Sequence, residues 1–184
     1  MYAVGLISRY MEQPKQDHFH TAKRILRYIK GTINHGLFCT HSQDSKLIGY
    51  LDSDYGGDID DRKNTLGNAF HIGSAIFSWS SKKQQTVALS SCEAEYIAAV
   101  ACTCQAIWLK NILKELHHEQ EDSITIHVDN KSAISLAKNL VSHNRSKHID
   151  TKYHFIREQV KNKVVELINC RTEEQLADFF LRSH

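Results

Sequence analysis

Apolar residues recur every three or four positions in several segments of the chain, which is the spacing of one helix face. Between Phe19 and Ile29 this spacing predicts an amphipathic helix over residues 15–30, with a basic outer face and Gly31 at its end. From Ser91 to about residue 117 the pattern is helical throughout and more apolar, so this long helix is expected to be largely buried. Further helices are expected to open at residues 130–132 and to cover residues 148–161 and 173–181.

Stretches rich in β-branched and alternating apolar residues lie between the helices and predict strands. The first three, residues 46–52, 67–72 and 75–80, follow one another along the chain, the last two separated by Gly73 and Ser74, and are expected to be antiparallel. Two more strands are expected at residues 123–129 and 164–170. This order of elements predicts an α/β fold in which helices pack on a mixed five-stranded sheet.

Composition limits the class of protein. With 184 residues, of which 41% are apolar and 24% charged, the chain is long enough for one domain with a proper core and a short appendage. No stretch approaches the roughly 20 continuous apolar residues that span a bilayer. The first residues also lack the basic start and cleavage site of a signal peptide. We therefore expect no membrane contact and a protein that stays inside a cell.

The cysteines, the histidines and the net charge argue against a disulfide framework, a structural zinc site and a strongly basic surface, respectively. The five cysteines are odd in number and scattered, which suits reduced thiols better than a disulfide framework. The twelve histidines are not paired with a Cys-x-x-Cys at zinc spacing, so a structural zinc is not expected. A net charge of +2 is only weakly basic, so any site for a polyanion must be local.

Four acidic residues lie where α/β proteins bind ligands or where a charge is costly. Asp52 and Asp129 end predicted strands, and the carboxyl ends of strands face the edge where ligands bind. Glu95 lies in the first turns of the long helix, and Asp178 interrupts an apolar run in the last helix. Each acid alone has a simpler explanation as a helix cap, a turn residue or a surface position.

Convergence of the four acids on one point is a much less ordinary pattern. Carboxylates that close together cannot all stay ionised unless cations lie among them. Oxygen ligands of this kind select Mg²⁺ or Mn²⁺. A pair of such ions about 4 Å apart activates a water, stabilises the leaving oxygen and holds a phosphate in line. The acids therefore predict a two-metal site for phosphodiester hydrolysis.

Several blocks of sequence surround these acids and run in order between about residues 46 and 180. They are DSDYGGD at 52–58, SWSSKKQ at 78–84, SSCEAEY at 90–96, VDNKSA at 128–133, KHID at 147–150, YHFIRE at 153–158 and TEEQLAD at 172–178. Together they resemble the ribonuclease H domain of copia-type (Ty1-like) retrotransposon polyproteins. Residues 1–35 resemble the tail of the reverse transcriptase region that precedes this domain in the family.

The resemblance implies a ribonuclease H-like fold over residues 46–184, preceded by a reverse transcriptase tail in residues 1–45. It implies endonucleolytic hydrolysis of the RNA strand of an RNA/DNA hybrid during reverse transcription, beside a reverse transcriptase domain. It also implies an intracellular location, either in the cytoplasm within a virus-like particle or in the nucleus. The implied catalytic residues hold two Mg²⁺ ions, for which Mn²⁺ can substitute, and are Asp52, Glu95, Asp129 and Asp178.

Two of these acids have close competitors in the sequence, Asp54 for Asp52 and Glu93 for Glu95. Acids two positions apart point to roughly opposite faces of a helix, and we expect only one of each pair to face the metals. Glu95 is preferred because it lies further into the helix and is followed by a YIAA segment that matches the family's catalytic helix face.

A hybrid duplex is recognised by its shape and its 2′-hydroxyl groups, so small polar groups and basic groups are both needed. The candidates for the hydroxyl groups are Ser90, Ser91 and Asn130. The candidates for the phosphates are Lys82, Lys83, Gln84, Arg145 and Lys147. A solvated turn is an equally simple explanation for the lysines.

Two rival interpretations differ in class. The first is a catalytically inactive retrotransposon-derived fragment that binds nucleic acid or a partner, because the chain begins inside a polymerase tail and ends in LRSH where the family usually has Thr-Lys-Pro. The intact acids and their flanks count against this interpretation. The second is another two-metal nuclease, an integrase or an exonuclease, but those families have a different arrangement of acids. The Asp-Ser-Asp at residue 52 and the lone Asp178 favour ribonuclease H.

Overall fold

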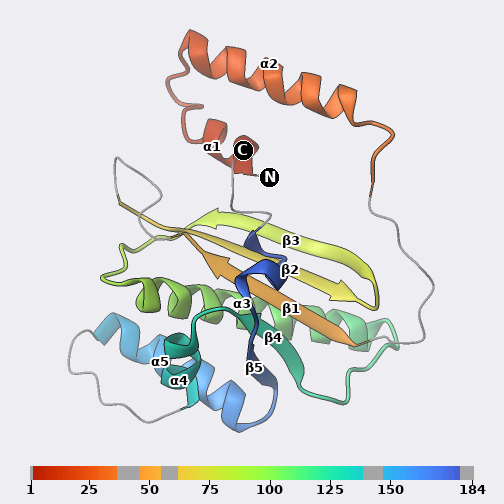
Figure 1. The fold of residues 1–184 in the computed structure, drawn as a ribbon, viewed down its shortest axis with the longest axis vertical. Coiled ribbons are helices and arrows are strands. Elements are labelled where there is room, and N and C mark those ends of the chain that lie inside the picture. The colour runs from red at the N-terminus through yellow and green to blue at the C-terminus, as the bar shows by residue number, and fades with distance from the viewer. Residues whose placement is uncertain (1, 37–45, 55–61, 139–146, 179–184) are drawn as a thin grey trace.

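A computed structural model of the chain describes residues 2–36, 46–54, 62–138 and 147–178, and leaves the side chains of residues 147–153 undescribed. Its elements, drawn in Figure 1, are α1 (Tyr2–Ser8), α2 (Gln16–Gly31), β1 (Leu47–Ser53), β2 (Thr65–Ile72), β3 (Ala75–Lys83), α3 (Ser91–Glu115), β4 (Ile124–Val128), α4 (Lys131–Lys138), α5 (Lys147–Lys161), β5 (Val165–Asn169) and a 3₁₀ helix, η1 (Thr172–Glu174). The predicted strands and the helices up to α5 are confirmed, with ends that differ by a few residues.

The strands form one mixed five-stranded sheet, as the sequence predicts, and their order in the sheet is β3-β2-β1-β4-β5. β1, β2 and β3 are antiparallel neighbours, whereas β4 is parallel to both β1 and β5. The parallel register aligns Tyr50 of β1 with His127 of β4. Asp52 and Asp129 each follow two residues later, so the register brings the two acids to the same edge of the sheet.

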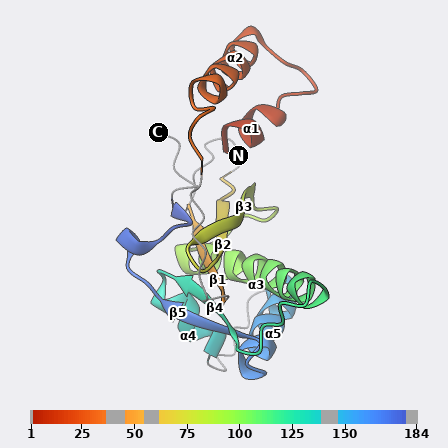
Figure 2. The same cartoon turned by 90° about the vertical axis from the view of Figure 1, so that its right-hand side faces the viewer.

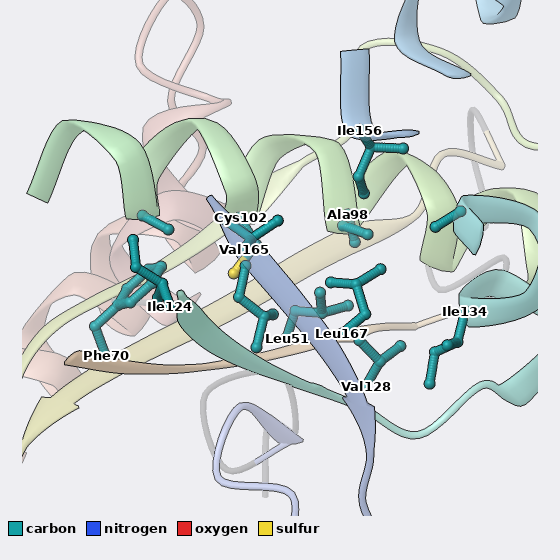
Figure 3. Close-up of a cluster of buried hydrophobic side chains, with 14 of the residues drawn as sticks. Leu51, Phe70, Ala98, Cys102, Ile124, Val128, Ile134, Ile156, Val165 and Leu167 are labelled. Carbon is teal, nitrogen blue, oxygen red and sulfur yellow. The ribbon is translucent and has the colours of Figure 1, made fainter. Parts of the chain in front are cut away.

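The main hydrophobic core lies between α3 and the sheet. Figure 3 shows Ala98 and Cys102 of α3 facing side chains of the sheet that include Leu51 of β1 and Val128 at the end of β4. Small residues on this face of the helix let it lie close to the strands, where burial of apolar surface is the main stabilising term. By length and composition alone α3 could cross a membrane, but core helices of globular domains pass the same test. The core thus fixes α3, and with it Glu95, against the strand that carries Asp52.

Helix α2 stands apart from the sheet in both views, whereas α1 lies between α2 and the sheet and contacts β3 (Figures 1 and 2). The helix at residues 2–8 was not expected from the sequence, whereas α2 matches the prediction for residues 15–30. No residue of α2 is buried, and apolar side chains such as Leu26 and Ile29 are more than half exposed. The expected domain boundary near residue 45 falls at residues 37–45, outside the described residues, and stays a prediction.

The last part of the chain differs from the helix predicted over residues 173–181. A 3₁₀ helix ends at Glu174, and the backbone is not helical again until Asp178. Gln175 interrupts the helix because its ψ of 96° is extended and its side chain hydrogen-bonds the sheet. The remainder of the predicted helix, residues 179–181, lies outside the described residues.

Candidate active site

Three of the four predicted acids meet at one edge of the sheet. Asp52 is the last but one residue of β1, Asp129 directly follows β4, and Glu95 lies in the second turn of α3. One carboxylate oxygen from each lies within 4.8 Å of the others. We call these three residues the acid cluster. Asp178 is not part of this close group, but it is near enough for its charge to raise the pKa of both Asp52 and Asp129.

A single backbone amide holds two of the carboxyl groups in place. The N–H of Ser53 donates to Asp52 Oδ1 at 2.8 Å and to Glu95 Oε1 at 3.0 Å. Glu95 is only 5% exposed, and its second oxygen, Oε2, has no hydrogen-bond donor among the residues that the structure describes. A buried carboxylate oxygen without a donor is costly, so this atom needs a proton or a cation.

Burial and mutual repulsion keep the acid cluster partly protonated. Burial first, and then the charges of Asp129 and Asp52, raise the pKa of Glu95 to about 9. Burial also raises the pKa of Asp52 to about 6 against the hydrogen bond from Ser53, and the charges of Asp129 and Asp178 raise it further. Protonated Glu95 donates a hydrogen bond to Asp52, which favours the ionised form of Asp52. The pair therefore shares one proton at neutral pH.

The donor set suits a hard divalent cation. Carboxylate oxygens are the ligands that Mg²⁺ and Mn²⁺ prefer, and the oxygens of the acid cluster already converge. A cation would neutralise the repulsion that raises these pKa values and would supply the partner that Glu95 Oε2 lacks. The geometry therefore fits the metal site expected from the sequence.

The two competing acids have other positions. Glu93 lies in the first turn of α3, where its Oε2 accepts a hydrogen bond from the N–H of Leu89 at 2.8 Å. Asp54 lies past the end of β1, where its Oδ1 accepts a short hydrogen bond from the N–H of Thr65. Neither belongs to the acid cluster, which agrees with the preference for Glu95 and Asp52.

The candidate 2′-hydroxyl ligands lie at two helix starts. Ser90 caps α3, because its Oγ accepts a hydrogen bond from the N–H of Glu93 at 3.1 Å, and Ser91 begins the helix with an exposed side chain. Asn130 caps α4, because its Oδ1 accepts from the N–H groups of Ser132 and Ala133. All three sites flank the acid cluster in sequence, and their contact with substrate stays a prediction.

One of the candidate phosphate ligands is misassigned. Gln84 is 3% exposed, and its side-chain N–H₂ donates to the carbonyl of Ala94 at 3.0 Å and to Ser53 Oγ at 3.3 Å. The expectation that Gln84 binds a phosphate is therefore wrong, because the amide is enclosed beneath the start of α3. Its neighbours in the same block lie at the end of β3, where Lys82 is exposed and Lys83 is half-buried.

The other two phosphate candidates have no described side chain. Arg145 lies in residues 139–146, outside the described residues. Lys147 is the first residue of α5, and only its backbone is described. Their expected role stays a prediction.

Two side-chain amides donate hydrogen bonds to backbone carbonyls beside the acids. The sequence did not predict these contacts. Asn169 at the end of β5 donates to the carbonyl of Val128 at 3.1 Å and to that of Asp129 at 3.0 Å. Gln175 donates to the carbonyl of Leu51 at 2.7 Å. The sequence gives only a weak indication of these contacts: Gln175 lies three residues before Asp178, and Asn169 lies at the end of a predicted strand. Ordinary surface amides occupy such positions as well.

Curated relatives match almost the whole chain. The retrovirus-related Pol polyprotein from transposon TNT 1-94 of Nicotiana tabacum is 43% identical over 98% of this chain. That from transposon RE2 of Arabidopsis thaliana is 41% identical over 96% of this chain. The chain spans only 14% and 12% of the length of these two polyproteins. No protein-family model matches the chain.

Solved structures share the fold at low sequence identity. A ribonuclease H1 isolated from compost by a metagenomic approach superposes with a TM-score of 0.55 at 14% identity, over 74% of this chain and 93% of the other. A foamy viral protease-reverse transcriptase superposes with a TM-score of 0.54 at 14% identity, over 87% of this chain and 30% of the other. Over almost its whole length, the chain is therefore homologous to a segment of the retrovirus-related Pol polyproteins of copia-type transposons, and it has the ribonuclease H fold.

Proposed function

We propose that this chain is a ribonuclease H that hydrolyses the RNA strand of RNA/DNA hybrids and that uses two Mg²⁺ ions, or Mn²⁺ in their place. The observation that carries the proposal is the acid cluster, in which a buried glutamate with one oxygen that lacks a donor among the described residues lies close to two aspartates at the ends of parallel strands. Such a group is costly to a fold unless it serves to bind a cation.

Two structural neighbours support the proposed substrate class. The compost ribonuclease H1 has also been solved in complex with an RNA/DNA hybrid, and the foamy viral protease-reverse transcriptase in complex with double-stranded DNA. Because this chain has the acid cluster, we propose that an RNA/DNA hybrid is also its substrate. We further propose that a reverse transcriptase domain acts beside this chain in a full polyprotein. Ser90, Ser91 and Asn130 would meet 2′-hydroxyl groups, and Lys82 and Lys83 would meet phosphates.

In the proposed mechanism each acid has a structural task. Asp52, held by the Ser53 amide, and Asp129, at the end of the neighbouring parallel strand, would hold the ions from the sheet. Glu95 would release its proton on metal binding and offer Oε2 from the helix side, and Asp178 would complete the set from the last segment. The ions, when bound, supply activation of a water and stabilisation of the leaving oxygen.

The test is cleavage of a labelled RNA/DNA hybrid by the purified chain in Mg²⁺. Asp129→Asn should abolish cleavage, because an amide cannot provide the charge that holds the ions. Asp122→Asn is the matched control, since Asp122 precedes the same strand at its other end and makes an exposed ion pair with Lys46 at 3.0 Å. The control should cleave like the wild type, and a DNA duplex should remain intact with all three proteins.

Equal, weak cleavage by the wild type and by Asp129→Asn would contradict the proposal. It would favour the rival interpretation of a catalytically inactive fragment that binds nucleic acid. Cleavage of the DNA duplex by the wild type would instead point to a different nuclease class. Circular dichroism of each variant establishes that a loss of cleavage does not come from a loss of the fold.

A further inference from the structure

Gln175 is a buried amide whose atoms all have described partners. Its side chain lies in the last described segment and is only 5% exposed. Nε2 donates to the carbonyl of Leu51 at 2.7 Å and contacts Cys170 Sγ at 3.4 Å, and Oε1 accepts from the N–H of Ala177 at 3.3 Å. A buried polar group with this many partners is fixed in one rotamer.

The two backbone groups that Gln175 holds are the immediate neighbours of two acids. Leu51 precedes Asp52 in β1, and Ala177 precedes Asp178. The partners are 124 residues apart in sequence for the first bond and two for the second. One side chain therefore ties the strand that carries Asp52 to the turn that carries Asp178.

We infer that Gln175 is a positioning residue for metal binding: its amide joins the backbone of Leu51, which precedes Asp52, to that of Ala177, which precedes Asp178, so that both carboxylates face the same ions. The inference rests on the proposed function. A neutral amide suits this task, because a lysine or an arginine here would compete with the cations and a glutamate would add another negative charge. Residues that orient metal ligands from behind contribute about 10- to 100-fold in metal affinity or activity.

Gln175→Met tests the inference, because methionine has a similar length and shape and removes both hydrogen bonds. Gln120→Met is the matched control. Gln120 Oε1 accepts from the N–H of Leu47 at 2.9 Å, so it is also a side-chain amide bound to the backbone of β1, but at the end of the strand remote from the acids. Both variants should lose some thermal stability, whereas only the first should lose metal affinity.

The measurement is Mn²⁺ binding by calorimetry, without substrate, at a temperature at which circular dichroism shows each protein folded. We expect Gln175→Met to bind Mn²⁺ about 10- to 100-fold more weakly than the wild type, and Gln120→Met to bind it as the wild type does. In Mg²⁺ the first variant should also lose kcat with little change in KM for the hybrid. Hydrogen exchange at the Ala177 amide should become faster in Gln175→Met only, because this amide loses its acceptor.

The outcomes separate the inference from the proposed function. If the wild type does not bind Mn²⁺, both the proposed function and the inference fail. If the wild type binds and Gln175→Met binds equally well, Gln175 has a purely structural role and the inference alone is overturned. If Gln175→Met does not fold, Gln175→Asn replaces it, since the shorter amide cannot reach both partners at once, and the same loss of affinity is expected.

Discussion

Replacement of Glu95 by glutamine should stabilise the metal-free protein while it removes metal binding. The Glu95 carboxyl is buried beside Asp52 and Asp129, and these surroundings raise its pKa to about 9 from an ordinary value of 4.5. A glutamine has the same shape, its Oε1 can accept from the Ser53 amide, and its N–H₂ can donate to Asp52 as protonated Glu95 does. Glu95→Gln would thus keep both contacts without an ionisable proton.

The magnitude follows from the linkage between protonation and folding. Between pH 4.5 and about 9 the folded protein keeps a proton on Glu95 that the unfolded chain has released, so the stability falls as the pH rises. Each pH unit costs about 1.4 kcal/mol, which amounts to about 3 kcal/mol at pH 7. Glu95→Gln removes this cost, and for a chain of this length the melting temperature should rise by roughly 5 to 10 °C. At pH 5 the gain should be less than about 1 kcal/mol.

The assay is thermal unfolding of both proteins in a chelator between pH 5 and pH 8. Glu93→Gln is the matched control, because it makes the same change two residues away, outside the acid cluster. Added Mg²⁺ should stabilise the wild type and leave Glu95→Gln unchanged, since ligands that bind only the folded state stabilise it. A lower melting temperature for Glu95→Gln at pH 8, or a gain that does not grow with pH, would refute the electrostatic reasoning.

Three further substitutions test the scaffold around the site, each by chemical denaturation. Gly49→Ala should cost about 1 to 3 kcal/mol, because a Cβ would lie 2.8 Å from Cε1 of the buried Phe70 ring, and full stability would contradict this close approach. Ser90→Ala should cost about 1 kcal/mol by removal of the α3 cap, and Ser90→Asp should restore it. Gln84→Met should cost about 1 to 3 kcal/mol, because it leaves the buried carbonyl of Ala94 without this donor, and an unchanged midpoint would show that another donor replaces the amide.

The sheet and the acid positions could be predicted because the chain contains strong local signals for them. Strand periodicity specifies β1 to β3, with a short turn between β2 and β3, and an acid that directly ends an apolar strand is visible without the structure. Asp52 and Asp129 come together through the parallel register of β1 and β4, which only the structure shows. Glu95 was separable from Glu93 because helical geometry sends residues two apart to different faces.

The polar groups that hold the acids could not be predicted in this way. Gln84 follows two lysines and precedes another glutamine, so the sequence resembles an exposed turn. Its burial depends on how the end of β3 meets the start of α3, which is a tertiary contact without a local signal. Gln175 was assigned to a regular helix for a similar reason, since its hydrogen bond to Leu51 connects residues 124 positions apart.

The three buried or bridging amides share a chemical property that the acids require. Gln84, Asn169 and Gln175 each donate to a backbone carbonyl of, or directly before, an acid: Ala94 before Glu95, Asp129 itself, and Leu51 before Asp52. An uncharged donor acts on the backbone with equal strength whether the carboxylates hold protons or cations, because it does not change the charge of the site. A lysine at any of these positions would neutralise the acids and weaken the attraction for Mg²⁺. Before a metal binds, these neutral amides hold the backbone beside the acids, and the proton on Glu95 reduces the repulsion among the carboxyl groups.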